Sequence, residues 1–312
     1  MPLLDSRMLH HRVCSTKDEY IWEGAFDLPT NEVILSWNGS RPQKGSYDFT
    51  VSFFIENQWT PPHLCASWSK DAQSTFSTKG KAFSQVEDTI IFADGFTPVS
   101  FRVTVSSGES LINLRWLHLW AGDFPKSKKE PSISNSQKVL LDLPQVSQAS
   151  LKVPYNRRIC SPCATAAALQ YLLKDTTIDP IHFAEKVYDQ NHSIYGNWVL
   201  NIAESSSVLG NHWCSYLKRL EGISELLDYI HQGLPVVCSI KGPIEGGASP
   251  YASGHLIAIS GYDPEAETIL CMDPAFPLDK PSPHMYSIEA FQKAWSKRGN
   301  LAYCFTPTNY LY

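Results

Sequence analysis

The chain has 312 residues, of which 43% are hydrophobic and 18% are charged, and its formal net charge is −5 at neutral pH. This composition is typical of a globular protein, and the length favours two domains over one. An acidic chain without a block of Lys and Arg is not expected to bind nucleic acid. No apolar run approaches the roughly 20 residues that cross a bilayer, so no membrane span is expected.

The amino-terminal residues lack the apolar core of a Sec-type signal peptide. Eight cysteines are too few for a disulfide scaffold in a chain of this length, so we expect free thiols that are mostly buried. Both features favour a cytoplasmic protein, and they are also compatible with a specialised secretion route.

Residues 1–125 are predicted to form an antiparallel β-sandwich of the jelly-roll type. Hydrophobic residues alternate with polar or small ones at 47–53 and 101–105, which is the pattern of strands with one buried face. The dipeptide Asn38-Gly39 marks one of several turns between short strands. This domain could dock a substrate, a ligand or a partner, or simply support its neighbour.

Six of the nine tryptophans lie in this first domain, at Trp22, Trp37, Trp59, Trp68, Trp116 and Trp120. Indoles fill large volumes in small sandwiches, so we expect them in the core. If they were exposed instead, they would form a stacking face for a carbohydrate or a peptide.

Residues 126–140 are rich in Ser, Lys and Pro without apolar periodicity, which indicates a linker. Residues 141–312 then predict an α+β domain, because helices come first and antiparallel strands follow. We expect the segments 190–215 and 241–253 to be loops that border its cleft. The expected helices are 164–173, 223–231 and 287–295, and the expected strands are 236–240, 255–259 and 268–272.

The cysteine pair Cys160 and Cys163 stands at the start of the first of these helices, with Ser161 placed to cap it and Pro162 in its first position. The N–H groups and the macrodipole of a helix amino terminus stabilise a thiolate. Cys160 is therefore a candidate nucleophile, although a Cys-Pro pair at this place can also serve capping and packing alone.

A histidine and an aspartate occupy related places in the following strands. His255 opens an apolar strand after a loop of small residues, and Asp273 ends the next strand. If the two strands form a hairpin, the carboxylate can reach the imidazole. A core histidine and an Asp-Pro turn are the structural alternatives. Together with Cys160, these residues supply a nucleophile, a base and a group that orients the base.

Four ordered stretches, LPQVSQ with ICSPCATAAALQYL, ELLDYIHQGLPVVCSI, SGHLIAISGYD and ILCMDPA, resemble the bacteriocin-processing (double-glycine leader) cysteine peptidases and their papain-like relatives. The resemblance covers about residues 140–305. It implies a papain-like cysteine peptidase domain that hydrolyses a peptide or isopeptide bond without a cofactor or a metal ion.

Carried over by position, the resemblance assigns a role to each matching residue. Cys160 is the nucleophile, His255 the general base, Asp273 the residue that orients it, and Gln148 the side-chain donor of the oxyanion hole, with Gln145 as a rival. The sequence departs from the family at Cys163, where Thr or a small residue is usual. The implied partner is a peptide or protein substrate, and transfer of the acyl group to an amine would use the same residues.

Three other interpretations stay open at this point. The Cys-x-x-Cys spacing is also that of thioredoxin-like redox proteins, which place a strand directly before the motif. A zinc site could use Cys160, Cys163, His212 and Cys214, although this spacing matches no common ligand pair. A non-catalytic protein that only binds a peptide or a carbohydrate is the third. Replacement of Cys163 and metal analysis would separate these interpretations from the peptidase.

Overall fold

The computed structural model describes residues 7–123, 137–280 and 282–311. The chain folds into two compact units. The first unit comprises Met1–Lys126, Lys186–Leu217 and Pro307–Tyr312, and the second comprises Ser127–Glu185 and Lys218–Thr306. Each unit is discontinuous in sequence, and the domain boundaries at residues 125 and 141 stay a prediction.

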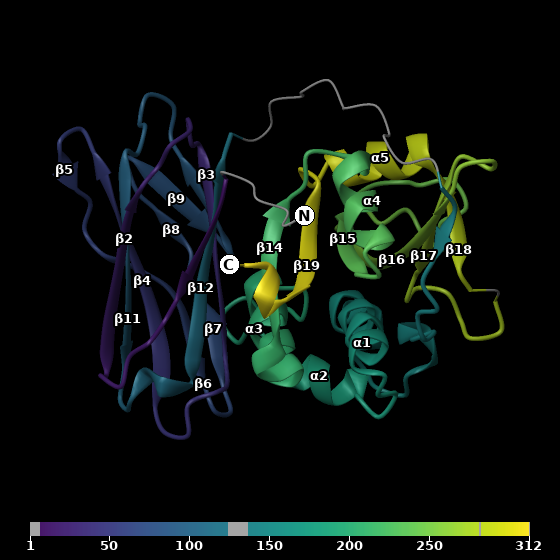
Figure 1. Ribbon diagram of the computed structural model, residues 1–312, viewed down its shortest axis with the longest axis horizontal. Helices are drawn as coiled ribbons and strands as arrows, with labels where there is room; N and C mark the ends of the chain where they lie inside the picture. Colours follow the sequence, from purple (N-terminus) through teal and green to yellow (C-terminus); the bar gives the residue numbers. More distant parts are fainter. Residues whose placement is uncertain (1–6, 124–136, 281, 312) are drawn as a thin grey trace. The chain divides into compact units, whose positions relative to one another are not determined.

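The first unit contains two antiparallel sheets of short strands (Figure 1). One sheet has the order β1 (Met8–Arg12), β12 (Leu114–Gly122), β3 (Glu32–Gly39), β10 (Thr89–Phe92), β9 (Phe83–Val86) and β8 (Thr78–Lys79). The other has the order β2 (Glu19–Ala25), β11 (Ser100–Ser107), β4 (Ser46–Ile55), β6 (His63–Ser69) and β7 (Gln73–Thr75), and β5 (Gln58–Trp59) pairs with β4.

Aromatic side chains fill the space between these two sheets. Trp37 on β3 stacks on Phe49 of β4 with ring centroids 4.0 Å apart, and Phe92 on β10 meets Phe53 of β4 edge to face. Five of the six tryptophans named above are buried, and Trp59 is half-buried. The indoles of the described residues therefore build a core, and the exposed tryptophan face that carbohydrate binding would need is not formed by them.

Trp37→Ala is expected to lower the free energy of unfolding by about 3–5 kcal/mol, because it opens a cavity between the two sheets. Trp59→Ala is the matched control, since it removes the same side chain from a half-buried position, and its effect should stay below about 1 kcal/mol. Urea denaturation followed by circular dichroism measures both values. Equal losses in the two variants would contradict this description of the core.

The segment expected as a loop at 190–215 contains a helix, α3 (Trp198–Leu209), which packs against β3 within the first unit. The loop prediction was wrong because the run of serines at 205–207 has poor helix propensity. Hydrogen bonds to its serines and at its amino terminus stabilise α3 despite this low propensity. The hydroxyl of Ser206 accepts a hydrogen bond from the Gly39 N–H at 2.8 Å, and Asn197 caps the helix through the Leu200 N–H.

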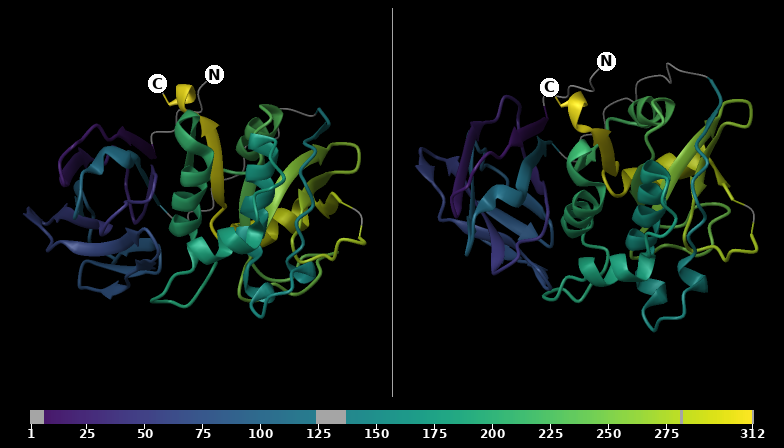
Figure 2. Two further views of the ribbon diagram at one scale, coloured as in Figure 1. Left: turned by 90° about the horizontal axis from the view of Figure 1, so that it is seen from below. Right: turned by 60° about the horizontal axis from the view of Figure 1, so that its bottom comes forward.

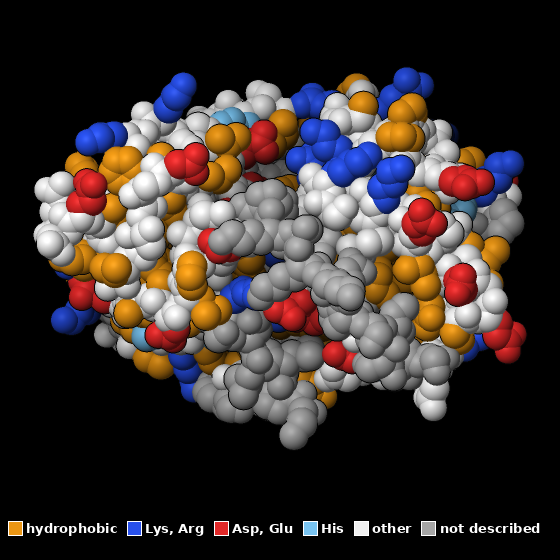
Figure 3. Space-filling model, turned by 90° about the horizontal axis from the view of Figure 1, so that it is seen from above, with side chains coloured by type: hydrophobic (Ala, Val, Ile, Leu, Met, Phe, Trp, Pro, Cys, Tyr) orange, Lys and Arg blue, Asp and Glu red, His pale blue; other side chains and the backbone are white. Residues whose placement is uncertain are grey.

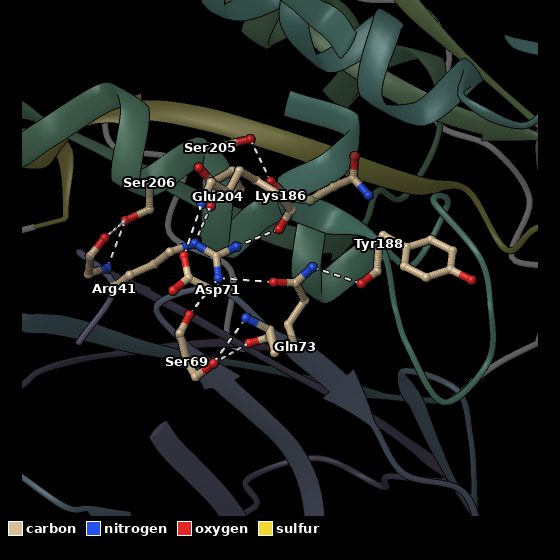
Figure 4. Close-up of polar contacts among 12 residues, drawn as sticks. Arg41, Ser69, Asp71, Gln73, Lys186, Tyr188, Glu204, Ser205 and Ser206 are labelled. Carbon is tan, nitrogen blue, oxygen red and sulfur yellow. Dashed lines mark hydrogen bonds and ion pairs between the residues drawn. The ribbon is translucent and has the colours of Figure 1, made fainter. Parts of the chain in front are cut away.

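Arg41 also ties this segment to the sandwich (Figure 4). Its Nε lies 2.9 Å from the Glu204 carboxylate, and its Nη1 donates to the Ser69 carbonyl at 2.6 Å and to the Gln73 amide oxygen at 3.0 Å. Gln73 in turn donates to the Tyr188 carbonyl. Arg41 and Glu204 are both about nine-tenths buried, so the pair stays together only while the segment remains folded on the strands.

The second unit is built on a sheet with the order β19 (Leu301–Pro307), β15 (Val236–Ile240), β16 (His255–Asp263), β17 (Thr268–Met272) and β18 (His284–Ser287), and β13 (Val139–Leu140) pairs with β16. The chain passes from the first unit to the second within β14 (Trp213–Arg219). The central strands β15 and β16 are buried along almost their whole length, as expected of strands covered on both faces. Helices α1 (Cys160–Leu173), α4 (Ile223–His231) and α5 (Ile288–Ser296) contact them (Figures 1 and 2). A further helix, α2 (Pro180–Val187), follows α1.

The predicted mixture of helices and antiparallel sheets is confirmed, and several bounds agree closely with α4, β15 and β17. The predicted cap of the first helix is wrong: α1 begins at Cys160 with Ile159 before it, and Ser161 lies inside the first turn. The Ser161 hydroxyl instead lies 2.9 Å from that of Tyr303. Residues 126–136 of the expected linker lie outside the described residues, and residues 139–140 form β13.

Within the described ranges, no helix has the length and hydropathy that crossing a membrane requires. On the face drawn in Figure 3, acidic and basic side chains both occur, with apolar atoms among them.

Candidate active site

Cys160 is the first residue of α1, and its side chain is half-buried. The first N–H groups of a helix have no partner within it and form the positive end of its dipole. Helix formers fill the rest of α1, and the residues from 161 to 170 are all buried, so the helix is anchored along most of its length. The thiol of Cys160 therefore lies at the amino terminus of a helix whose position is fixed by its buried residues.

His255 is the first residue of β16 and is 3% exposed. The residue before it, Gly254, has a φ of 104°, and a Cβ at this position would lie 2.1 Å from the guanidinium of Arg298. That guanidinium donates to the Ser253 carbonyl at 2.6 Å. The arginine end can move, but the positive φ itself favours glycine, so Gly254 lets the chain turn into β16 with His255 as its first residue.

Asp273 directly follows β17, which pairs antiparallel with β16. The expected hairpin brings the two side chains together: the Nε2–H of His255 donates to Oδ1 of Asp273 at 2.7 Å. Oδ1 also accepts the N–H of Ala275 at 2.9 Å. The aspartate is 2% exposed, so this pair is closed to bulk water.

Two tyrosines that the sequence did not reveal complete the surroundings of Asp273. The hydroxyls of Tyr251 and Tyr286 donate to Oδ2 at 2.9 and 2.7 Å. The ring of Tyr251 also stacks on the imidazole of His255, with centroids 4.1 Å apart and planes 6° from parallel. Neither residue belongs to a motif, and both sit near the site only because of how the strands and the loop before β16 fold.

The thiol and the imidazole interact directly and shift each other's pKa. Burial alone would raise the pKa of Cys160, but the charge and hydrogen bond of His255, with N–H groups of Leu256 and Ser161, lower it. Burial alone would lower the pKa of His255, but the negative charges of Asp273 and Cys160 raise it to about 10. The pair therefore favours thiolate and imidazolium at neutral pH.

The other half of the cysteine motif has opposite properties. Cys163 is fully buried one turn into α1, and burial raises the pKa of its thiol. Burial likewise raises the pKa of Cys65, Cys214, Cys238, Cys271 and Cys304. Between residues 141 and 159 the chain forms short 3-10 turns, η2 (Gln148–Ser150) and η3 (Asn156–Arg158), rather than the strand that precedes a thioredoxin motif.

No group of three or more His, Cys, Asp or Glu among the described residues is arranged to hold a metal ion.

Gln148 and Gln145 differ in what their side chains contact. The Gln145 amide donates to the carbonyls of Pro277 and Lys280 at 3.4 and 3.3 Å. Gln148 begins η2, and its backbone N–H donates to the Pro274 carbonyl at 2.9 Å. Its side-chain oxygen is buried and has no hydrogen-bond partner among the described residues. The backbone of Gln148 is thus hydrogen-bonded to the residue that follows Asp273. The Gln145 amide, in contrast, is occupied by two loop carbonyls.

The chain was compared with known structures, curated proteins and protein families. A crystal structure of a candidate C39-like peptidase from Bacillus anthracis is similar, with a TM-score of 0.43 and 20% sequence identity, covering 55% of this chain and 98% of that one. A comparison with curated proteins found no match. Residues 140–303, more than half of the chain, match the model of the Peptidase_C39 like family. The chain therefore belongs to the Peptidase_C39 like family.

Proposed function

We propose that this protein is a cysteine peptidase with a papain-like catalytic domain, in which Cys160, His255 and Asp273 form the catalytic triad. The observation that carries the proposal is the geometry around His255: one ring nitrogen donates to Asp273 at 2.7 Å, and the imidazole interacts with the one described thiol whose pKa is lowered. This is the relation of nucleophile, base and orienting group that acyl transfer requires.

In the first step, the Cys160 thiolate attacks the carbonyl carbon of the scissile peptide bond and a tetrahedral intermediate forms. The His255 imidazolium then gives its proton to the leaving amine, the C–N bond breaks, and a thioester to Cys160 remains. Asp273 holds the imidazole in the orientation and tautomer that this transfer needs.

In the second step, His255 is neutral and removes a proton from water as the water attacks the thioester. Cys160 leaves as a thiolate, and the free acid is released. An amine could take the place of water, so hydrolysis and transamidation share these residues, and the mass of the product separates them. A reducing compartment such as the cytoplasm would keep the thiol available.

The negative oxygen of the tetrahedral intermediate needs hydrogen-bond donors close to Cys160, at the amino terminus of α1. We assign this role to the N–H of Cys160 and the side-chain amide of Gln148. Gln148→Ala is expected to lower kcat by about 10²–10³-fold, because one oxyanion donor is lost. Gln145→Ala is the matched control and should keep kcat within about threefold of the wild type, since that amide binds loop carbonyls. A larger effect at Gln145 would reverse the assignment.

The proposed activity is tested with a mixture of synthetic peptides, read by mass spectrometry for new termini, and with a peptidyl electrophile that traps thiol peptidases. The proposal predicts new termini and one covalent adduct, on Cys160. Peptides with a double-glycine site belong in the mixture, because the sequence resembles leader peptidases. Labelling of other cysteines with Cys160 unmodified, and no cleavage, would overturn the proposal.

A further inference from the structure

The Asp273 carboxylate has a second oxygen that the catalytic triad does not use. Oδ1 accepts from His255 and the Ala275 N–H, whereas Oδ2 accepts from the phenols of Tyr251 and Tyr286. At 2% exposure the carboxylate cannot replace a lost donor with bulk water. The two hydroxyls therefore determine how the carboxylate is turned toward His255.

Tyr251 acts on both members of the pair. Its hydroxyl reaches Asp273 while its ring lies flat on the imidazole of His255. Its backbone has a φ of 45°, which is unusual for a residue with a large side chain. The N–H groups of Gly242 and Gly254 both donate to the Tyr251 carbonyl, at 3.0 and 2.9 Å. The loop before β16 thus holds this tyrosine in a strained conformation over the site.

We propose that Tyr251 and Tyr286 are positioning residues of the site: their hydroxyls and the ring of Tyr251 hold Asp273 and His255 in the arrangement that keeps Cys160 as a thiolate. This inference rests on the proposed function. Burial and the negative charge of Asp273 raise the pKa of both phenols, so they stay protonated and can donate throughout the range from about pH 5 to 9.

Loss of either hydroxyl has a defined electrostatic consequence. Burial opposes ionisation of Asp273, and the imidazolium charge and the hydrogen bonds lower its pKa. With one donor missing, the carboxylate stays ionised but is held less firmly against His255. The imidazolium is then a weaker counter-charge for the Cys160 thiolate, so the pKa of Cys160 rises. The titratable groups that face this carboxylate are His255, Tyr251, Tyr286, Cys271 and His284.

The test is the rate of Cys160 alkylation by iodoacetamide, resolved by peptide mass spectrometry from about pH 5 to 9. Tyr251→Phe and Tyr286→Phe each remove one hydroxyl and keep the ring. Each should move the acid limb of the rate profile up by about 1 pH unit, which is about tenfold slower alkylation below that limb. Tyr251→Leu, which also removes the stacked ring, should slow the alkylation of Cys160 further.

Tyr262→Phe is the matched control, because it removes the hydroxyl of a buried tyrosine on the same strand as His255, outside the site. Its profile should equal that of the wild type. In a His255→Ala background, Tyr286→Phe should not change the alkylation rate of Cys160 any further, because the Tyr286 hydroxyl acts on the thiol through the imidazole. An equal slowing in that background would overturn the inference.

The outcomes separate this inference from the proposed function. If wild-type Cys160 alkylates as an ordinary thiol, the proposed function fails. If wild-type Cys160 is activated and both phenylalanine variants keep the wild-type profile, only the positioning role fails. Faster alkylation of the buried Cys65 and Cys163 would show that a variant does not fold. The positioning role is then tested with the other phenylalanine variant.

Discussion

Replacing Cys160 with alanine is expected to lower kcat/KM by at least about 10⁴-fold for any peptide that the wild-type protein cleaves. Without the thiolate no thioester can form, and only binding and oxyanion stabilisation remain. The fold should be unaffected, because the side chain is half-buried and small. The measurement is the rate of new-terminus formation by mass spectrometry, together with the loss of the covalent adduct.

Cys163→Ala is the matched control three residues along the same helix. Its thiol is fully buried and its pKa is raised, so it supplies no thiolate to the site. Peptide cleavage should stay within about threefold of the wild type, with a stability loss of about 1 kcal/mol. A redox protein of the Cys-x-x-Cys type requires both thiols, so abolished activity in both single variants would favour redox chemistry over peptide hydrolysis.

Asp273→Ala is expected to lower kcat by about 10³–10⁴-fold, because His255 loses the group that orients it. The pH profile should change as well. Burial lowers the pKa of His255, and Asp273 and Cys160 together raise it to about 10, so without Asp273 only Cys160 opposes burial and that pKa falls. The imidazolium that protonates the leaving amine then disappears at a lower pH, and the alkaline limb of kcat/KM moves downward.

Asp273→Asn separates orientation from charge. Its amide oxygen can still accept from His255, so the loss in kcat should be smaller than for alanine, while the alkaline limb should move in the same direction. Kinetics over about pH 5 to 10 distinguish the two effects. A wild-type profile in both variants would show that Asp273 does not act on His255 and would contradict the proposed triad.

The sequence predicted those parts of the molecule whose signals are local. Period-two alternation indicated the strands of the sandwich, and the bounds of α4, β15 and β17 follow from caps and turns at their ends. Cys160, His255 and Asp273 each stand at the end of a predicted element, and pairing of β16 with β17 brings the last two together.

The remaining features depend on contacts between distant residues. Tyr251 and Tyr286 belong to no motif, and an aromatic residue after a glycine-rich loop gives no sign that it will stack on a histidine. The helix α3 has a serine-rich sequence with weak propensity, and it is stabilised by partners such as Gly39 more than a hundred residues away. The resemblance assigns the oxyanion role to Gln148 by position, and the hydrogen bonds of the Gln145 amide to loop carbonyls are a further reason that the sequence does not contain.

The proposed mechanism depends on a thiolate–imidazolium pair between Cys160 and His255. The alkylation rate of each cysteine from about pH 5 to 9, in the wild type and in His255→Ala, tests this pair. Cys160 is expected to alkylate rapidly near pH 6 in the wild type and more slowly in the variant, while the buried cysteines stay unreactive in both. If Cys160 instead alkylates like an ordinary thiol with a pKa of about 8.5, and His255→Ala leaves its rate unchanged, the thiolate–imidazolium pair does not exist.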